Sequence, residues 1–189
     1  MMIPLVGLTG PQGSGKTTVA GFLVSAFGWK AISLADPIRA GLQAMFGMHG
    51  HEFEDRVLKE HPIGWHGKTP RQLMQSLGTE WGRKMVSETI WIDLAQHEIE
   101  FSLRLNKDYR GLAVSDVRFA NEAEWIRGMG GTIWHLHDRI FDRIGPANRQ
   151  DAHESEDGVR FASGDKIVDN SGTMDDLYDQ VLLLQRELR

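Results

Sequence analysis

The chain has 189 residues, of which 41% are hydrophobic and 25% are charged, a composition typical of one globular domain with a sizeable core. The net charge of −5 argues against a protein that binds nucleic acid polymers, which normally carries a basic excess. The absence of cysteine excludes disulfides, thiolate metal sites and cysteine catalysis, and no apolar run approaches the ~18 residues of a membrane span. We therefore expect a soluble, cytoplasmic protein without a membrane partner.

Short apolar strands alternate with helices along the chain. We expect strands at 3–9, 30–34, 111–115, 131–137 and 166–168, and helices at 16–27, from Asp36 on, at 119–129 and from Met174 on. The segment from Asp36 to about Asn106 is mostly helical and contains a polar stretch at 49–68. The alternation predicts an α/β fold of three layers, in which helices cover both faces of a parallel sheet. In such sheets ligands bind beyond the carboxyl ends of the strands.

A glycine-rich loop follows the first of these strands. Gly10–Thr17 fits the pattern G-x-x-x-x-G-K-[ST] at every fixed position, with an apolar strand before it and a helix after it. The glycines allow several backbone N–H groups to point at one anion beside the positive end of a helix. In such a P-loop, Lys16 bridges the β- and γ-phosphates of a nucleotide and the Thr17 hydroxyl is a ligand of Mg²⁺. The sequence therefore predicts a nucleotide phosphate site.

Two aspartates on the predicted ligand edge each have two interpretations. Asp116 follows the strand at 111–115, where the second Mg²⁺-binding carboxylate is expected, but this position also suits a cap of the helix at 119–129. Asp36 precedes Pro37 at the start of a helix, which favours a capping role. Asp36 could instead take the proton of an alcohol acceptor, as in kinases that act on dephospho-coenzyme A or a sugar.

Arginines gather around the same predicted edge. They are expected to bind a second anionic substrate or to stabilise a transition state, and they are Arg39, Arg71, Arg118, Arg139, Arg143 and Arg149. The last three lie in the long irregular stretch 137–164. Stretches of this length are usually lids, binding loops or disordered segments, and a lid suits phosphoryl transfer because it excludes water.

Further segments resemble one family almost from end to end of the chain. Besides GLTGPQGSGKTT at 7–18, they are DPIR at 36–39, RQLMQSLGTE at 71–80, VSDVRFANE at 114–122, GGTIWHL at 130–136, HESE at 153–156 and DNSGTMDDL at 169–177. In these segments the chain resembles the deoxynucleoside monophosphate kinases of tailed bacteriophages, a branch of the P-loop nucleoside and nucleotide kinases. Many activities share the P-loop, whereas RQLMQSLGT and the D-x-R-x-x-x-E pattern of Asp116, Arg118 and Glu122 are more particular.

The resemblance implies a single P-loop kinase domain over 1–189, with an acceptor-binding helical region at about 37–106 and a lid at about 138–164. It implies transfer of the γ-phosphate of ATP, with Mg²⁺, to a deoxynucleoside 5′-monophosphate, in the cytoplasm of the host cell if a phage encodes the protein. The region 49–68 is shorter than the acceptor-side insertion of better-known members, which leaves the base preference open.

The resemblance and the P-loop together assign roles to individual residues. Those expected to bind ATP are Gly10, Gln12, Gly13, Ser14, Gly15, Lys16, Thr17, Thr18, Asn170, Gly172 and Thr173. By the resemblance, the segment Asn170–Thr173 would flank the adenine. Those expected to bind the acceptor are Asp36, Arg39, Arg71, Gln75, Gly78, Thr79, Asp116, Arg118 and Glu122. The expected catalytic charges are Lys16, Arg118, Arg139 and Arg143, and the expected ligands of Mg²⁺ are Thr17 and Asp116.

Two other functions stay open on the sequence alone. One is a kinase that phosphorylates an alcohol, and the other is a nucleotide-binding module without transfer activity. A monophosphate acceptor needs no general base, because its second pKa of about 6 leaves the attacking oxygen largely ionised at neutral pH. The Leu182–Leu184 run suits either a homodimer or packing against the sheet.

Overall fold

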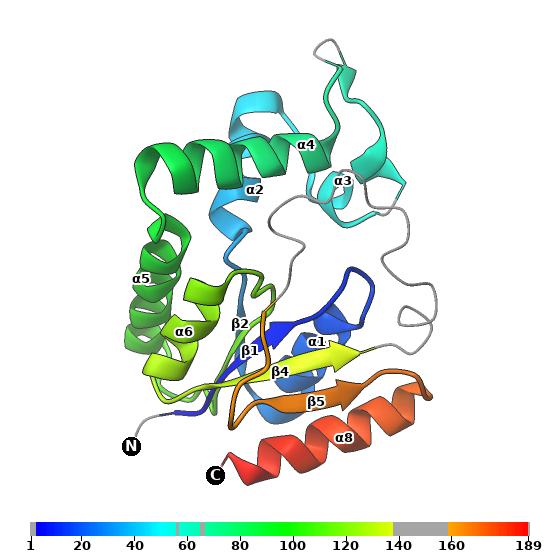
Figure 1. Ribbon diagram of the computed structural model, residues 1–189, viewed down its shortest axis with the longest axis vertical. Helices are drawn as coiled ribbons and strands as arrows, with labels where there is room; N and C mark the ends of the chain where they lie inside the picture. The colour runs from blue at the N-terminus through cyan, green and yellow to red at the C-terminus, as the bar shows by residue number, and fades with distance from the viewer. Residues whose placement is uncertain (1–2, 56, 65–66, 138–158, 189) are drawn as a thin grey trace. The chain divides into compact units, whose positions relative to one another are not determined.

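The computed structural model describes residues 3–55, 57–64, 67–137 and 159–188. Within these ranges, five parallel strands form one sheet in the order β2-β3-β1-β4-β5 (Figure 1). The strands are β1 (Leu5–Thr9), β2 (Lys30–Ile32), β3 (Leu112–Val114), β4 (Thr132–His137) and β5 (Lys166–Asp169). The predicted α/β fold with a parallel sheet is confirmed, and the strands differ from the predicted ones only at their ends.

β1 lies at the centre of the sheet, between β3 and β4. Its Gly7 pairs with Val114 of β3 and with Ile133 of β4. Because all strands run in the same direction, their carboxyl ends meet at one edge, and the loop that begins at Gly10 leaves the sheet from the middle of that edge. The sheet therefore places the glycine-rich loop where ligands of open α/β sheets bind.

The helices differ from the predicted ones mainly in the middle of the chain. α1 (Lys16–Phe27) has the predicted bounds, and α6 (Ala120–Gly128) and α8 (Met174–Glu187) lie at the predicted places. The mostly helical region comprises α2 (Asp36–Phe46), α3 (Gly50–Glu54), the 3₁₀ turn η1 (Leu58–Glu60), α4 (Pro70–Gln75), the π-helix η3 (Ser76–Val86) and α5 (Ile90–Leu105). In the described ranges, no helix is both long and apolar enough to cross a membrane.

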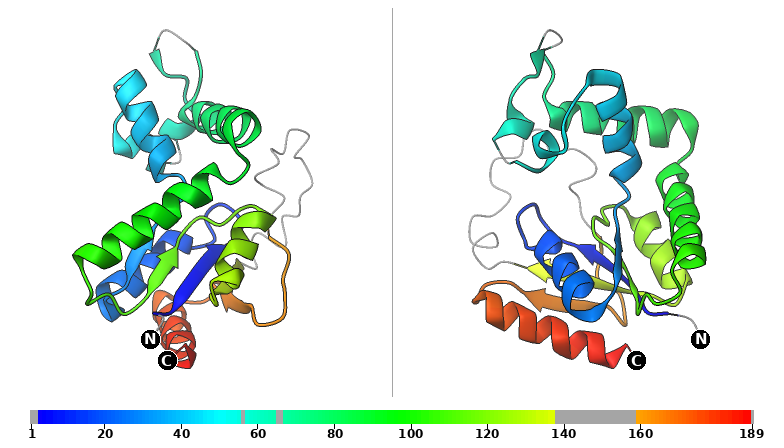
Figure 2. Two further views of the ribbon diagram at one scale, coloured as in Figure 1. Left: turned by 90° about the vertical axis from the view of Figure 1, so that its left-hand side faces the viewer. Right: turned by 180° about the vertical axis from the view of Figure 1, so that it is seen from behind.

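The main hydrophobic core lies between the sheet and two helices, α1 and α8, which lie side by side on one face (Figures 1 and 2). Its completely or almost completely buried members include Val6, Leu8, Leu23, Trp134, Leu136 and Leu177. α6 covers the opposite face at close range. An added Cβ on Gly7 would lie 2.6 Å from Cδ1 of Ile126 and 2.7 Å from Cδ1 of Ile133, so this approach requires glycine in β1.

The contacts divide the chain into two compact units, Met1–Ser33 with Ile99–Arg189, and Leu34–Glu98. The first unit contains the sheet with α1, α6 and α8. In the second unit, α2 packs closely against η3. An added Cβ on Gly78 of η3 would lie only 3.0 Å from Cδ1 of Ile38 in α2. Nε1 of Trp91 donates a 2.7 Å hydrogen bond to the Gly78 carbonyl, which ties α5 to η3. The predicted acceptor-binding region 37–106 covers most of this second unit, and its binding role stays a prediction.

The start of α2 corrects one expectation. The N-cap of α2 is Ala35, so Asp36 lies in the first turn and the predicted capping role of Asp36 is wrong. Its carboxylate instead accepts a 2.7 Å hydrogen bond from Nη2 of Arg39, one turn further along the helix. A negative side chain in the first turn still stabilises the helix, because it lies close to the positive end of the helix dipole.

Candidate active site

The loop between β1 and α1 has the backbone that the glycine pattern predicts. Gly10, Gly13 and Gly15 have φ values of 142°, 84° and 98°, which side-chain-bearing residues rarely adopt. Space also requires two of these glycines. An added Cβ on Gly10 would lie 2.4 Å from the Leu136 carbonyl oxygen, and one on Gly15 would lie 2.5 Å from Nδ2 of Asn170. The loop therefore lies close against Leu136 of β4 and against Asn170 at the end of β5.

Lys16 closes the loop on itself. Its ammonium group donates hydrogen bonds of 2.7 Å to the carbonyl oxygens of Gly10 and of Pro11. The Ser14 N–H donates to the Pro11 carbonyl at 3.2 Å, and the Ser14 side chain is completely buried. The loop thus forms a compact turn that holds one positive charge at the carboxyl end of the central strand, which is the geometry of a phosphate site.

The first turn of α1 completes this part of the site. Thr17 is exposed and Thr18 is half-buried, and both follow Lys16, the first residue after the N-cap Gly15. Gln12 and Gly13 are exposed at the tip of the loop. The N–H groups in the first turn of any helix lack intrahelical partners and favour an anion, so these positions suit a phosphate.

Asn170 joins the end of β5 to the loop. Its Nδ2 donates a 3.1 Å hydrogen bond to the Ser14 carbonyl, and its N–H donates at 2.8 Å to the His137 carbonyl at the end of β4. Thr173 is the N-cap of α8, where its hydroxyl exchanges hydrogen bonds with Asp176. Gly172 lies against the same Asp176. Of the residues expected to flank ATP beyond β5, the structure thus brings Asn170 to the phosphate loop and places Gly172 and Thr173 at the start of α8.

Asp116 lies at the carboxyl end of β3, the neighbour of β1. Its Oδ2 accepts a 2.5 Å hydrogen bond from the Ser33 hydroxyl at the end of β2, and the next residue, Val117, donates from its N–H to the Leu8 carbonyl at 3.0 Å. The N-cap of α6 is Phe119, so the alternative role of Asp116 as the cap of that helix is wrong. In the described part of the chain, no group of three or more histidine, aspartate or glutamate side chains could hold a metal ion.

Arg118 and Glu122 follow Asp116 and have different environments. Arg118 is exposed. Glu122 is only 3% exposed, and its Oε2 accepts hydrogen bonds from the N–H groups of Arg118 at 2.8 Å and Phe119 at 3.0 Å. Glu122 therefore fixes the turn that leads into α6 and, through it, the backbone of Arg118. Contact of either residue with an acceptor nucleotide stays a prediction.

The remaining expected acceptor residues lie in the second unit. Nε of Arg71, at the start of α4, donates a 2.5 Å hydrogen bond to Glu60, and Arg39 pairs with Asp36 as described above. Gln75 ends α4, and the buried Gly78 and Thr79 belong to η3. This set thus occupies the helices α2 and α4 and the π-helix, a type of widened helix that is frequent at functional sites.

Part of the prediction lies outside the described residues. These positions include Arg139, Arg143 and Arg149, the HESE segment at 153–156, and most of the expected lid at 138–164. The expected catalytic charges therefore reduce, within the described ranges, to Lys16 and Arg118.

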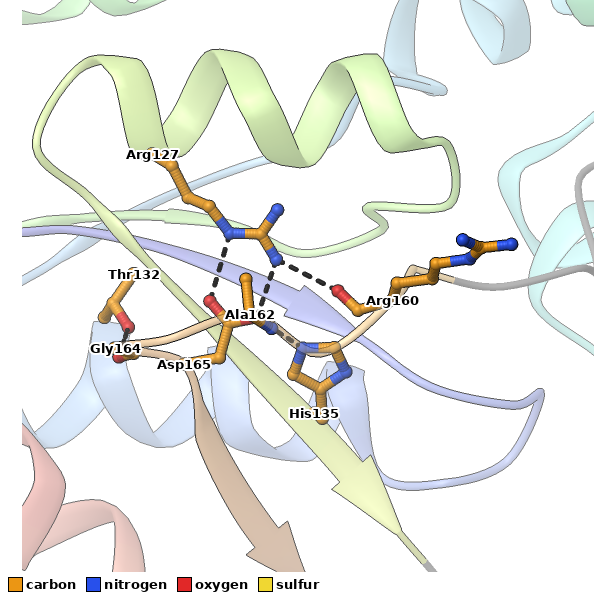
Figure 3. Close-up of polar contacts among 7 residues, drawn as sticks. All are labelled: Arg127, Thr132, His135, Arg160, Ala162, Gly164 and Asp165. Carbon is orange, nitrogen blue, oxygen red and sulfur yellow. Dashed lines mark hydrogen bonds and ion pairs between the residues drawn. The ribbon is translucent and has the colours of Figure 1, made fainter.

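Sequence reasoning missed a buried polar cluster formed by Arg127 of α6, His135 of β4 and Asp165 (Figure 3), which we call the Asp165 cluster. The Asp165 side chain is 1% exposed. Arg127 donates to it from Nε at 3.1 Å and from Nη2 at 2.6 Å, His135 Nε2 lies 2.9 Å from Oδ2, and the Ala162 N–H donates at 2.9 Å. Burial alone would raise the pKa of Asp165, but these hydrogen bonds outweigh it and lower the pKa to about 2.

The Asp165 cluster fastens the segment that leads into β5. Nη2 of Arg127 also donates to the Arg160 carbonyl at 3.2 Å, and the Thr132 hydroxyl donates to the Gly164 carbonyl at 2.8 Å (Figure 3). The signal in the sequence was His135 itself, a polar residue in the middle of the apolar strand TIWHLH. A buried polar side chain needs a partner, although the sequence does not reveal which residue supplies it.

The comparison with known families agrees with this geometry. A profile described as deoxynucleotide monophosphate kinase matches residues 68–181. The chain belongs to the deoxynucleotide monophosphate kinase family. The matched range begins before α4 and ends within α8, so it includes η3, Asp116, Glu122 and Asn170. The resemblance seen in the sequence is thereby confirmed.

Relatives of this family come from several viruses. A protein of Acanthamoeba polyphaga mimivirus is 31% identical over 187 residues, which cover 94% of each chain. The deoxynucleotide monophosphate kinase of Escherichia phage RB69 is 29% identical over 59% of this chain and 42% of its own length. The deoxynucleoside-5′-monophosphate kinase of Escherichia phage T5 is 35% identical over 48% of this chain and 35% of its own length. The chain thus spans nearly the whole mimivirus relative and less than half of these phage kinases.

Solved structures support the fold. The crystal structure of TT1252 from Thermus thermophilus has a TM-score of 0.55 at 19% identity and covers 100% of both chains. A dephospho-CoA kinase from Campylobacter jejuni has a TM-score of 0.50 at 12% identity and covers 97% of this chain and 96% of its own. The α/β fold of this deoxynucleotide monophosphate kinase family member is therefore that of P-loop kinases.

Proposed function

We propose that the protein transfers the γ-phosphate of ATP to a deoxynucleoside 5′-monophosphate and forms the diphosphate. The observation that carries this proposal is the compact glycine-rich loop at the end of the central strand, with the Lys16 ammonium bonded to its carbonyls, in a chain that belongs to the deoxynucleotide monophosphate kinase family. The names of the phage relatives support the acceptor class.

Lys16 supplies the positive charge for the donor phosphates. In the structure its ammonium group donates to two loop carbonyls, and phosphate oxygens would offer stronger, charged acceptors for the same donors. The N–H groups of the loop and of the first turn of α1 are uncharged donors that would also bind the phosphate oxygens. These groups hold the donor in place and neutralise the charge that shifts onto its β-phosphate oxygens during transfer.

The acceptor requires alignment rather than a base, because its phosphate is largely ionised at neutral pH. Among the described arginines, we assign Arg39, Arg71 and Arg118 to the acceptor. Glu122 fixes the backbone of Arg118. Asp36 is paired with Arg39, which fits an ionic role in holding that arginine better than a role as the base of an alcohol kinase.

Thr17 and Asp116 are the residues that would hold Mg²⁺. A hydroxyl and a carboxylate are the oxygen ligands that this ion prefers, and a site completed by phosphates needs no cluster of carboxylates, in line with the described residues. The ion would neutralise phosphate charge. Ser33 donates to Oδ2 of Asp116 and thereby fixes the orientation of the carboxylate.

The test is an ADP-release assay with Mg·ATP against each ribo- and deoxynucleoside monophosphate, with dephospho-coenzyme A and gluconate alongside. We expect ADP release that depends on one or more deoxynucleotides, and its loss in Lys16→Ala. Lys166→Ala is the matched control, because Lys166 pairs with Glu187 at the amino end of β5, away from the loop. Activity with an alcohol only would favour the alcohol kinase, and ATP binding without any transfer would leave a nucleotide-binding module.

A further inference from the structure

Gly15 links the phosphate loop to α1 and is the residue on which the direction of the loop's last peptide depends. Its φ and ψ are 98° and 9°, and its carbonyl accepts the first hydrogen bond of the helix from the Val19 N–H at 3.0 Å. The helix therefore fixes the peptide that follows Gly15. Glycine adopts many φ values at little cost, so the helix alone does not fix the peptide that precedes it.

Asn170 fixes that preceding peptide. Its Nδ2 donates to the Ser14 carbonyl at 3.1 Å. The carbonyl of one residue and the N–H of the next point in opposite directions in a trans peptide, and no peptide of the described residues is cis. The hydrogen bond from Asn170 therefore directs the Gly15 N–H away from Asn170, at the positive end of α1. An N–H group at this end of a helix is one that an anion can accept.

Asn170 is itself held firmly. Its own N–H donates to the His137 carbonyl at 2.8 Å, and the residue before it, Asp169, pairs with His137 in the sheet. The Gln180 side chain of α8 accepts from the Asp169 N–H at 3.0 Å and donates to the Asp169 carbonyl at 2.8 Å. The Asn170 amide thus extends from a backbone that a strand and a helix both fix, which is what a rigid support requires.

We infer that Asn170 is a positioning residue of the phosphate loop: its side chain sets the orientation of the Ser14–Gly15 peptide and so prepares the Gly15 N–H for a polyphosphate. This inference rests on the proposed function and makes it more specific. It differs from a role in flanking the adenine, because a loop-positioning residue acts on every polyphosphate, with or without a base. Asn170 would then affect binding through the loop rather than through contact with the nucleoside.

The experiment compares two ligands by isothermal titration calorimetry: ATP, and inorganic tripolyphosphate, which has no nucleoside. For Asn170→Ala we expect affinity for both ligands to fall by the same factor, about fivefold, the effect of one net hydrogen bond. The NMR order parameter of the Gly15 N–H in the absence of ligand should also fall, because the peptide loses its fixed orientation. Asn170→Ser, whose shorter side chain does not reach the Ser14 carbonyl, repeats the test if the alanine variant does not fold.

Thr132→Val is the matched control. Like Asn170→Ala, it removes one side-chain donor from one backbone carbonyl, here that of Gly164. Thr132 lies at the amino end of β4, however, at the opposite end of the strand from the loop. We expect it to leave both affinities unchanged.

Three results would overturn the inference. A loss confined to ATP would make Asn170 a nucleoside contact, unchanged affinities would make its hydrogen bond irrelevant to binding, and an equal loss in Thr132→Val would indicate general destabilisation. The proposed function can fail separately: a wild-type protein that binds tripolyphosphate with the expected dependence on Asn170 but transfers no phosphate refutes the transfer reaction only. A wild-type protein that binds neither ligand refutes both.

Discussion

Asp165→Asn removes the negative charge of the Asp165 cluster and keeps the size of the side chain. The pKa of Asp165 is about 2 in the folded protein, against an ordinary value of 3.8. One pKa unit corresponds to about 1.4 kcal/mol, so ionisation of this carboxyl group contributes about 2 kcal/mol to the free energy of unfolding at pH 7. Because the side chain is 1% exposed, solvent screens this contribution little.

The substitution also turns one acceptor oxygen into an N–H donor. In the folded protein both carboxylate oxygens accept hydrogen bonds, from Arg127, His135 and the Ala162 N–H, so the new donor faces another donor. We therefore expect Asp165→Asn to lower the free energy of unfolding at pH 7 by about 2 to 4 kcal/mol.

The dependence on pH is the sharper part of this prediction. The folded-state pKa lies below the unfolded one, so the stabilisation is complete above about pH 4 and is lost as the pH falls through about 2. The difference between wild type and Asp165→Asn should be about 1 kcal/mol smaller at pH 3 than at pH 7. Urea unfolding followed by tryptophan fluorescence at both pH values measures it.

Asp179→Asn is the matched control, because Asp179 is an exposed carboxylate on α8 and the same substitution there should change stability by less than about 0.5 kcal/mol. A loss in Asp165→Asn that stays the same at pH 7 and pH 3 would refute the electrostatic reasoning. A loss as small as that of the control would refute the role of the cluster in the fold.

The other expectations concern the loop, the acceptor and the π-helix. Lys16→Ala should abolish phosphate transfer with an unchanged unfolding midpoint; a near-normal rate in the coupled assay would contradict the loop mechanism. Arg118→Ala should raise the KM of the acceptor more than that of ATP, and equal changes in steady-state kinetics would show that the acceptor lies elsewhere. Gly82→Ala should destabilise the protein by about 1 to 3 kcal/mol, because its Cβ would lie 2.3 Å from the Trp91 ring, whereas Gly21→Ala, with open space in α1, should stabilise it slightly in thermal unfolding.

Local patterns in the sequence predicted the elements that local chemistry decides. The helix 16–27 follows from the glycine-rich loop before it, and the structure has the same bounds, with Gly28 as C-cap. The parallel sheet followed from the alternation of short apolar strands with helices. The resemblance supplied the family, which the profile match over 68–181 confirms.

Local sequence patterns could not predict features that depend on side-chain geometry or on residues far apart in the chain. The sequence places Asp36 where a helix cap is expected, but its carboxylate pairs with Arg39. Whether the carboxylate binds the N–H groups of the helix or the arginine depends on side-chain geometry, which the sequence does not reveal. The Asp165 cluster joins residues 30 and 38 positions apart, so no local spacing reveals it. The π-helix η3 is wider than an α-helix, and the Trp91 ring packed against Gly78 and Gly82 accompanies this shape. The residues expected around the nucleotides keep their assigned roles as predictions.

The strand order also bears on how the chain folds during synthesis. β1 pairs only with β3 and β4 among the described strands, and β2 pairs only with β3. No pair of the described strands can therefore form before Leu112 has been synthesised, which takes roughly 5 to 20 s at typical rates of translation. Throughout that time β1, with its five buried residues, has no partner strand in the nascent chain. A ribosome pause placed before codon 112 should therefore prolong the exposure of this apolar segment to chaperones, whereas a pause after β5 should not.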